Sequence, residues 1–301
     1  MTVTQVMRHP ALFVCLVLFC LQAGWSQPLE TTAARTLEFL PGSPLFPPLA
    51  ANPQEPRVGV RKDIGSSRLK LDIGSTLDFL QYTLDDSGRA RIRMGAEFFT
   101  YALTTSAEGL RLQVDAVDGF FGGHVLFRLD DGSHAYVVRL RLMHLSAHLV
   151  DGHYDTHAGI WKDNRLPLPF TRDFGELLGA ATLPVWGMPL TLYSGFSYAT
   201  LVRPENLRRL TSLHGFDIHT PGGEHRLLGK AYELYAAFNL TLTGIPAYGG
   251  TNVLEGGIKF GQWNGAGIKL YVNYVSGLQV FSQYYNERRS MWGIGFAFEV
   301  M

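Results

Sequence analysis

Residues 141–157, RLMHLSAHLVDGHYDTH, concentrate side chains that could do chemistry. This stretch holds four of the chain's ten histidines, which are His144, His148, His153 and His157. Ser146 stands two residues after the first of them. Histidine can serve as a general base, a metal ligand or a pH-sensitive group, and serine becomes a nucleophile beside a base. Which of these roles is available depends on whether the stretch is a helix or a strand.

The spacing of the histidines separates a metal site from a catalytic pair. His144 and His148 are four residues apart, which on a helix puts two zinc ligands on one face. On a strand the same two residues are about 13 Å apart, too far to share one ion whose bonds to nitrogen are about 2.0–2.1 Å long. His144 and Ser146, by contrast, share one face of a strand with Cα atoms about 6.6 Å apart. A strand therefore favours a Ser–His pair.

The residues before His144 alternate between apolar and charged side chains. The apolar set is Tyr136, Val138, Leu140 and Leu142, and the charged set is Arg139 and Arg141. A helix cannot sort residues in this way because its faces repeat every 3.6 residues. His144 and Ser146 continue the apolar parity near the end of this strand. The pattern predicts no metal site and no cofactor, and it leaves His144 and Ser146 either as catalytic residues or as ordinary polar residues at the rim of a sheet.

The same alternation recurs along most of the chain. It is clearest at residues 69–79, 89–98, 228–242, 268–274 and 292–300. Turn-forming sequences rich in Asp, Asn and Gly separate these stretches at residues 85–88, 130–133, 221–223 and 264–265. The pattern predicts an all-β fold of about a dozen strands, each of roughly 9–14 residues.

Composition and charge exclude several classes of protein. Of 301 residues, 33 are glycine and 13 tyrosine, and 26 acidic side chains balance 26 basic ones. Glycine and aromatic residues at this level are typical of a β protein. Because there is no basic excess, nucleic acid is not an expected partner.

The N-terminal residues predict export. An apolar run at residues 11–21 follows Arg8 and is too short to cross a bilayer, which takes about 20 residues. We expect a signal peptide at residues 1–26, and it contains both cysteines of the chain, Cys15 and Cys20. Residues 27–56 follow as an irregular segment because six prolines between positions 41 and 56 forbid a regular helix or central strand. The barrel domain is expected at residues 57–301.

An alternating strand can face its apolar side inward, in a soluble barrel, or outward, against lipid. Long strands, small residues on the polar face and an alternating aromatic strand at the C-terminus favour the membrane. Aromatic residues expected near strand ends, as interfacial girdles, are Tyr82, Tyr101, Phe127, Tyr193, Tyr198, Tyr271 and Trp292. We predict a closed antiparallel transmembrane β-barrel of about 12 strands in the bacterial outer membrane. Its expected partners are outer-membrane lipid and the barrel-assembly machinery; the sequence sets no oligomeric state.

Three further groups of residues carry specific predictions. Arg91, Arg93, Arg111, Arg139 and Arg141 share the polar parity of their strands. They either line an anion-attracting lumen or pair with Asp72, Glu97 and Asp115 to fill a narrow barrel. The glycine-rich residues 118–123, DGFFGG, predict a bend between strands. His153 and His157 are expected in a solvated loop.

Three stretches also resemble a known family. They are LFPPLAANPQEPR at residues 45–57, MHLSAHLVD at 143–151 and GLQVFSQYY at 277–285. They are similar to an uncharacterised family of Gram-negative envelope proteins that is expected to form outer-membrane barrels. This resemblance implies a location in the outer membrane and a β-barrel fold, and it implies no activity.

The His-x-Ser pair resembles a second group of proteins. Outer-membrane phospholipase A and a lipid A deacylase carry such a pair as His-x-Ser-Asn, and Ala147 stands here in place of that Asn. The candidates for an orienting third residue are Asp151, Asp155 and Asn164.

Three functions remain open from the sequence. The first is a barrel with no assignable activity, either a narrow pore or a binding scaffold. The second is a lipid acyl hydrolase that uses Ser146 and His144. The third is a periplasmic β-barrel that binds a small apolar ligand.

Overall fold

The computed structural model describes residues 35–106, 112–222, 225–227, 229–245 and 247–299. The expected signal peptide lies outside the described residues, as does the start of the Pro-rich segment. Among the described residues, the regular structure is β-strand with three short 3-10 turns. No described helix is long and apolar enough to cross a bilayer.

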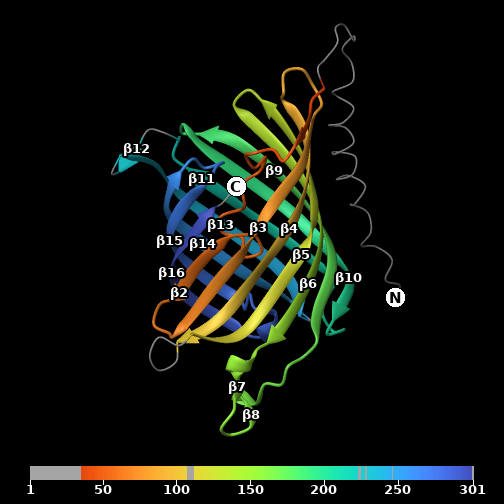
Figure 1. Cartoon of the computed structure of the whole chain (residues 1–301), viewed down its shortest axis with the longest axis vertical. Helices are drawn as coiled ribbons and strands as arrows, with labels where there is room; N and C mark the ends of the chain where they lie inside the picture. The colour runs from red at the N-terminus through yellow and green to blue at the C-terminus, as the bar shows by residue number, and fades with distance from the viewer. Residues whose placement is uncertain (1–34, 107–111, 223–224, 228, 246, 300–301) are drawn as a thin grey trace, which may run out of the picture. The chain divides into compact units, whose positions relative to one another are not determined.

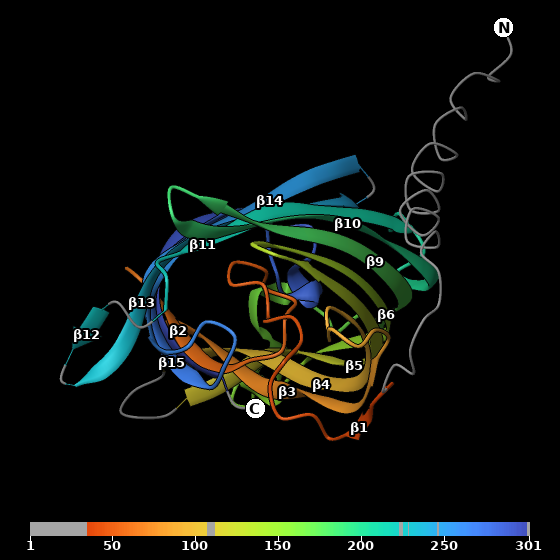
Figure 2. The same cartoon turned by 90° about the horizontal axis from the view of Figure 1, so that it is seen from above.

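Twelve strands close into one antiparallel barrel, which confirms the predicted fold class (Figures 1 and 2). In order they are β2 (Val58–Asp63), β3 (Arg68–Thr83), β4 (Ala90–Ser106), β5 (Leu112–Asp131), β6 (His134–Leu149), β9 (Phe170–Val185), β10 (Met188–Arg203), β11 (Leu210–His219), β13 (Lys230–Ile245), β14 (Ala247–Gly261), β15 (Gly267–Leu278) and β16 (Arg288–Glu299). Each strand pairs with its neighbours in this order, and the pairing of β16 with β2 closes the ring.

Several short elements lie outside these twelve strands. β1 (Leu37–Phe39) pairs with the far end of β3, and β12 (His225–Leu227) pairs with the first residues of β13. A hairpin of β7 (Tyr154–Asp155) and β8 (Ile160–Trp161) projects from the long β6–β9 connection (Figure 1). The turns η1 (Asp151–His153), η2 (Lys162–Asn164) and η3 (Ser282–Tyr284) lie at the same end of the barrel. Outer-membrane barrels keep short turns on the periplasmic side, so this long-loop end faces the outside of the cell.

The alternation turns apolar side chains outward and charged ones inward. In β6, Leu140 and Leu142 are 44% and 65% exposed, whereas Arg139 and Arg141 are buried in the lumen. The same parity holds on β15, where Leu270 is exposed and Lys269 is buried. An apolar wall with a polar interior is the arrangement that lipid requires. The strands therefore span the outer membrane, as predicted.

The predicted aromatic girdle is wrong for three of its members. Tyr101, Tyr193 and Tyr271 point into the lumen, where each is almost fully buried. Buried tyrosine hydroxyls need partners, and Tyr101 donates to the backbone oxygen of Val280 at 3.0 Å. Tyr198 and Trp292 do lie on the outer wall, where each is 53% exposed.

The glycine-rich residues 118–123 form no bend, so that prediction is wrong. They lie within β5 and pair in continuous register with β4 and β6. A Cβ atom on Gly122 would lie 2.0 Å from the backbone oxygen of Leu142. Glycine here allows close approach of two strands, a role that is equally typical of glycine within a sheet.

The barrel wall is interrupted beside β3, where two short strands take the place of one long strand. β1 and β2 both pair with the same edge of β3, β1 at residues 80–82 and β2 at residues 69–72. Between them, residues 40–57 leave the wall and turn into the lumen (Figure 2). We call this segment the plug. Leu49 and Ala50 of the plug are buried to 1% exposure, and the backbone N–H of Ala50 donates to Asp217 on β11 at 3.1 Å.

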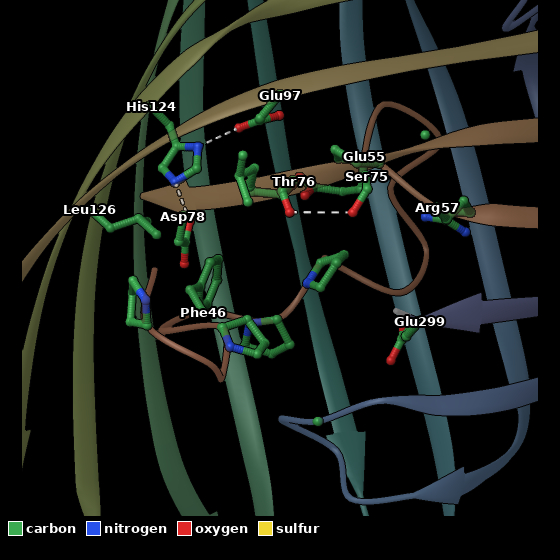
Figure 3. Close-up of a pocket in the computed structure, with 18 of the residues that line it drawn as sticks. Phe46, Glu55, Arg57, Ser75, Thr76, Asp78, Glu97, His124, Leu126 and Glu299 are labelled. Atoms are coloured by element: carbon green, nitrogen blue, oxygen red, sulfur yellow. Dashed lines mark hydrogen bonds and ion pairs between the residues drawn. The ribbon is translucent and has the colours of Figure 1, made fainter. Parts of the chain in front are cut away.

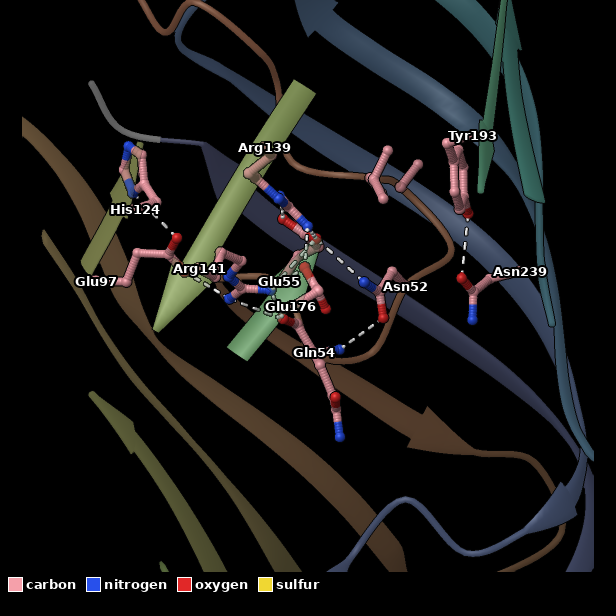
Figure 4. Close-up of polar contacts among 12 residues, drawn as sticks. Asn52, Gln54, Glu55, Glu97, His124, Arg139, Arg141, Glu176, Tyr193 and Asn239 are labelled. Atoms are coloured by element: carbon pink, nitrogen blue, oxygen red, sulfur yellow. Dashed lines mark hydrogen bonds and ion pairs between the residues drawn. The ribbon is translucent and has the colours of Figure 1, made fainter. Parts of the chain in front are cut away.

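Buried ion pairs join the plug to the wall (Figure 4). Arg139 donates to both carboxylate oxygens of Glu55 in the plug, at 2.9 and 2.6 Å, and to Glu176 on β9 at 3.1 Å. Arg141 donates to Glu97 at 2.5 Å, so this predicted pairing is confirmed. The predicted partners Asp72 and Asp115 instead meet Lys70 and His153. Arg139 and Arg141 thus help to fill the lumen, whereas Arg111 lies outside the described residues.

A charge placed at mid-height on the outer wall tests the orientation. Leu140→Arg is expected to destabilise the folded barrel by about 2–4 kcal/mol, since arginine is costly at the bilayer midplane. Tyr136→Arg, on the same face close to the periplasmic end of β6, is the matched control, with an expected cost of about 0–1 kcal/mol. Urea titration of refolding in lipid vesicles measures both. Equal costs at the two depths would contradict the lipid-facing assignment.

Candidate functional site

His144 and Ser146 lie on the outer wall of β6, near the end that faces the outside of the cell. The outward parity of Leu140 and Leu142 continues through both residues, as the sequence predicted. Each is partly exposed, and the side chain of His144 is 33% exposed. Within the described part of the chain, the Ser146 hydroxyl makes no hydrogen bond. A strand therefore presents both groups on one face, where lipid meets water.

Asp173 on β9 completes this group. It stands directly opposite His144 in the register of β6 and β9. Its Oδ1 atom lies 2.5 Å from Nδ1 of His144. A carboxylate on Nδ1 orients the imidazole ring and places its other nitrogen, Nε2, where it can act as a base. Carboxylate, imidazole and hydroxyl thus lie on adjacent strands of one surface.

The sequence did not identify Asp173. Its three candidates, Asp151, Asp155 and Asn164, all lie in the long β6–β9 connection, and none of them contacts His144. Asp155 has other partners, because the backbone N–H groups of Ala158 and His157 donate to it and hold its pKa below the usual value. The available sequence clue was a carboxylate at an outward-facing position of β9.

Apolar and small side chains surround this group. The ring of Phe121 on β5 lies 4.7 Å from the ring of His144, centroid to centroid. Phe121 and Leu142 are both exposed to lipid. Gly119 pairs with Ser146, and even an added Cβ there would stay 4.0 Å from the Ser146 Oγ atom. The serine hydroxyl is thus open to a molecule that lies along the wall.

The other histidines of the stretch play different parts. His148 follows on the same outer face and is exposed. His157 lies in the connection and is exposed, as predicted. His153 is buried, so its prediction as a solvated residue is wrong. Its Nδ1 lies 3.1 Å from Asp115, and its Nε2 donates to the backbone oxygen of Lys162 at 2.9 Å, which ties the connection to β5.

Among the described residues, no group of three or more His, Cys, Asp or Glu side chains is placed to hold a metal ion. His144 and His148 lie on a strand, at the spacing that separates two ligands too widely for one zinc ion.

Comparisons with known proteins give similarity to solved barrels only. No family model and no curated protein matches the chain, so the resemblances to the envelope family and to phospholipase A are not confirmed. The β domain of the Bordetella autotransporter BrkA is 12% identical over 80% of this chain and 96% of that chain, with a TM-score of 0.44. The translocator domain of the autotransporter NalP from Neisseria meningitidis is 12% identical over 96% and 95%, with a TM-score of 0.39.

A third solved structure is OmpT, an outer membrane protein of Vibrio cholerae. It is 12% identical over 90% of this chain and 99% of that chain, with a TM-score of 0.35. The fold and the outward apolar wall described above make this chain a β-barrel protein of the bacterial outer membrane.

Proposed function

We propose that this barrel is a lipid acyl hydrolase of the outer membrane. Ser146 is the nucleophile, His144 the general base, and Asp173 the residue that orients His144. The observation that carries the proposal is the contact of Asp173 with Nδ1 of His144, 2.5 Å long and made from a separate strand. A nucleophile, its base and a third group that orients the base form the arrangement of known serine hydrolases on several unrelated folds.

The proposed reaction uses these three groups in turn. The Oγ of Ser146 attacks the carbonyl carbon of an ester while Nε2 of His144 takes the hydroxyl proton. Asp173 stabilises the imidazolium that forms. The tetrahedral intermediate collapses, the C–O bond of the ester breaks, and the leaving alcohol takes the proton from His144. Water then attacks the acyl-serine with His144 again as base, which releases the fatty acid and restores Ser146.

The location of the site selects the substrate. Ser146 faces the bilayer close to its outer surface, beside the exposed side chains of Phe121 and Leu142. An acyl chain in the outer leaflet can lie along these residues while its ester bond stays at the level of Ser146. Water for the second half of the reaction is available at the same height. The substrate class is therefore a long-chain ester of a membrane lipid.

The plug bears on the narrow pore, which belongs to the first of the three functions that the sequence predicted. Plug residues Leu45, Leu49 and Ala51 are buried inside the barrel, and the buried ion pair of Glu55 with Arg139 joins the plug to the wall. A binding scaffold, the other form of that function, is compatible with a cavity of about 400 Å³ between the plug and β3 (Figure 3).

Covalent labelling tests the proposed nucleophile. A fluorophosphonate with a long alkyl chain is expected to label the folded barrel at Ser146, because an activated serine reacts with it and an ordinary one does not. Mass spectrometry of the digested protein locates the label. Ser276, an outward serine on β15 whose hydroxyl is hydrogen-bonded to that of Ser290 at 2.9 Å and to no imidazole among the described residues, is the internal control and should stay unlabelled. No label at Ser146, or equal label at both serines, would contradict the proposal.

A further inference from the structure

A second cavity, smaller than the one between the plug and β3, lies in the half of the lumen that faces the outside of the cell. The plug forms one side of it, at Pro53 and Gln54. The connection between β15 and β16 forms another side, because its η3 turn folds into the ring of strands (Figure 2). The barrel wall contributes Arg172 of β9 and two threonines of β13, Thr241 and Thr243. The cavity therefore lies where the plug, the wall and an inward-folded connection meet.

The size of this cavity limits its occupant. Its volume is about 80 Å³. Sites for organic ligands commonly measure about 300–1,000 Å³, whereas one water molecule takes up about 30 Å³ in the liquid. The space suits one small ion with about one or two water molecules, and it is too small for a lipid, a sugar or a peptide.

Arg172 supplies the charge of the cavity. Among the described residues that line it, Arg172 is the only one with a charged side chain. Its Nη2 atom donates to the hydroxyl of Thr211 on β11 at 3.2 Å, and its guanidinium carbon lies 6.0 Å from the ring centroid of Phe174. Its Nε atom is shut off from the cavity, whereas Nη1 is accessible and has no hydrogen-bond partner within the described part of the chain.

The carboxylates near Arg172 on its own strand have other partners. Asp173 follows Arg172 in the chain but lies on the outer face of β9, where it contacts His144. Glu176 faces the lumen and accepts from Arg139 at 3.1 Å. Neither carboxylate therefore forms an ion pair with Arg172.

One further carboxylate lies behind the lining. Asp118 of β5 accepts from the backbone N–H of Ser282, a cavity residue, at 2.9 Å. The cation that interacts with Asp118 is Lys70, and no described carboxylate interacts with Arg172. A cation held inside a protein without an anion is costly. The protein around this cavity thus leaves one positive charge without a partner.

Two hydroxyl groups of β13 add uncharged donors. Thr243 stands opposite Thr211, the hydrogen-bond partner of Arg172, in the register of β11 and β13. Thr241 accepts from Nδ2 of Asn239 at 3.0 Å, so its own hydroxyl proton is free to be donated. Guanidinium and hydroxyl groups are both donors to anions. The lining therefore offers an anion one charged donor and two neutral ones.

We propose that this cavity binds a monovalent inorganic anion of the chloride class, held by Arg172 and Thr243. One negative charge matches the single unpaired positive charge, whereas a divalent anion such as sulfate would leave an excess negative charge in the lumen. Because the plug forms one side of the cavity, the bound anion also stabilises the folded, plugged barrel. The site lies inside the barrel, separate from His144 and Ser146 on the outer wall, and does not depend on the proposed hydrolase.

Urea titration of the folded barrel in lipid vesicles tests this proposal. The buffers are mixtures of sodium chloride and sodium gluconate at constant ionic strength, since gluconate has the same charge as chloride and is too large for the cavity. The urea midpoint of the wild-type barrel is expected to rise with chloride and to level off, as mass action requires for one bound ligand. Sodium sulfate in place of chloride should give no rise that levels off.

Three variants locate the effect. Arg172→Met removes the charge, keeps much of the side-chain volume and is expected to abolish the saturable rise. Arg165→Met is the matched control, because Arg165 lies at the same end of the barrel but is paired with Glu287, and it should keep the rise. Thr243→Val retains the charge and removes one hydroxyl. It should raise the chloride concentration for half of the effect about tenfold, as loss of a hydrogen bond to a charged group does.

Three outcomes would overturn the proposal. They are a wild-type midpoint without a saturable response to chloride, an equal response in Arg172→Met, and an equal response to sulfate. If Arg172→Met fails to fold, bromide decides instead, because it resembles chloride in size and charge and scatters X-rays anomalously. Crystals of the wild-type barrel in sodium bromide are expected to show an anomalous peak within hydrogen-bonding distance of Arg172 Nη1. A cavity without such a peak would show that it takes no monovalent anion.

Discussion

Ser146→Ala is expected to lower the rate of ester hydrolysis by the folded barrel by about 10⁴-fold or more, as loss of the nucleophile does in serine hydrolases. His144→Ala should have an effect of similar size, because the serine hydroxyl is a weak nucleophile without a base. Asp173→Ala is expected to cost less, about 10²-fold, since its carboxylate is partly exposed and water can replace part of its contact. Release of fatty acid from phospholipid in mixed micelles measures all three rates.

The pattern of combined substitutions distinguishes a working triad from three unrelated residues. In a triad the effects do not add, so Ser146→Ala with Asp173→Ala should be no slower than Ser146→Ala alone. Asp151→Ala and Asn164→Ala change polar residues of the nearby connection that do not contact His144, and both should retain wild-type rates. Heat-modifiability on gels shows whether each variant folds. Hydrolysis that persists at the wild-type rate in Ser146→Ala would eliminate the proposal.

The barrel itself could be predicted from the sequence because its physical cause is local. Leucine faces outward and arginine faces inward at alternate positions, as at Leu140 and Arg141, because lipid lies outside the wall and a polar lumen lies inside it. The sequence therefore predicted correctly that His144 and Ser146 face outward. The same rule misled for Tyr101 and Tyr193, because tyrosine has an apolar ring and a polar hydroxyl and suits either side.

Long-range register could not be predicted in the same way. Asp173 meets His144 because β9 pairs with β6 in one particular register after a connection that includes η1, β7, β8 and η2. Nothing in either strand alone sets that register. The route of the plug depends on similar long-range contacts, such as that of Glu55 with Arg139, which are 84 positions apart in the chain. The prolines of this segment indicate irregular structure only.

Arg139→Ala is expected to release the plug from the wall. The guanidinium group of Arg139 bonds to Glu55 and Glu176, and all three side chains are buried. Removal of one partner leaves two carboxylates in the interior without that cation, which typically costs about 3–5 kcal/mol. Urea titration of the folded barrel measures this loss. Since Glu55 belongs to the plug, we also expect ion conductance in planar bilayers to rise above that of the wild-type barrel.

Arg89→Ala is the matched control for Arg139→Ala, because it also removes an arginine from an ion pair. Arg89 pairs with Asp85 at 3.7 Å in the exposed turn between β3 and β4, where such pairs contribute about 0–1 kcal/mol. Glu55→Gln separates the two parts of the effect, since it removes the plug's charge and leaves Arg139 paired with Glu176. We expect it to raise conductance as Arg139→Ala does, with a smaller loss of stability. If both variants conduct no more than Arg89→Ala, contacts other than the Glu55–Arg139 pair hold the plug in the lumen, and the apolar contacts of Leu45 and Leu49 are then the next candidates.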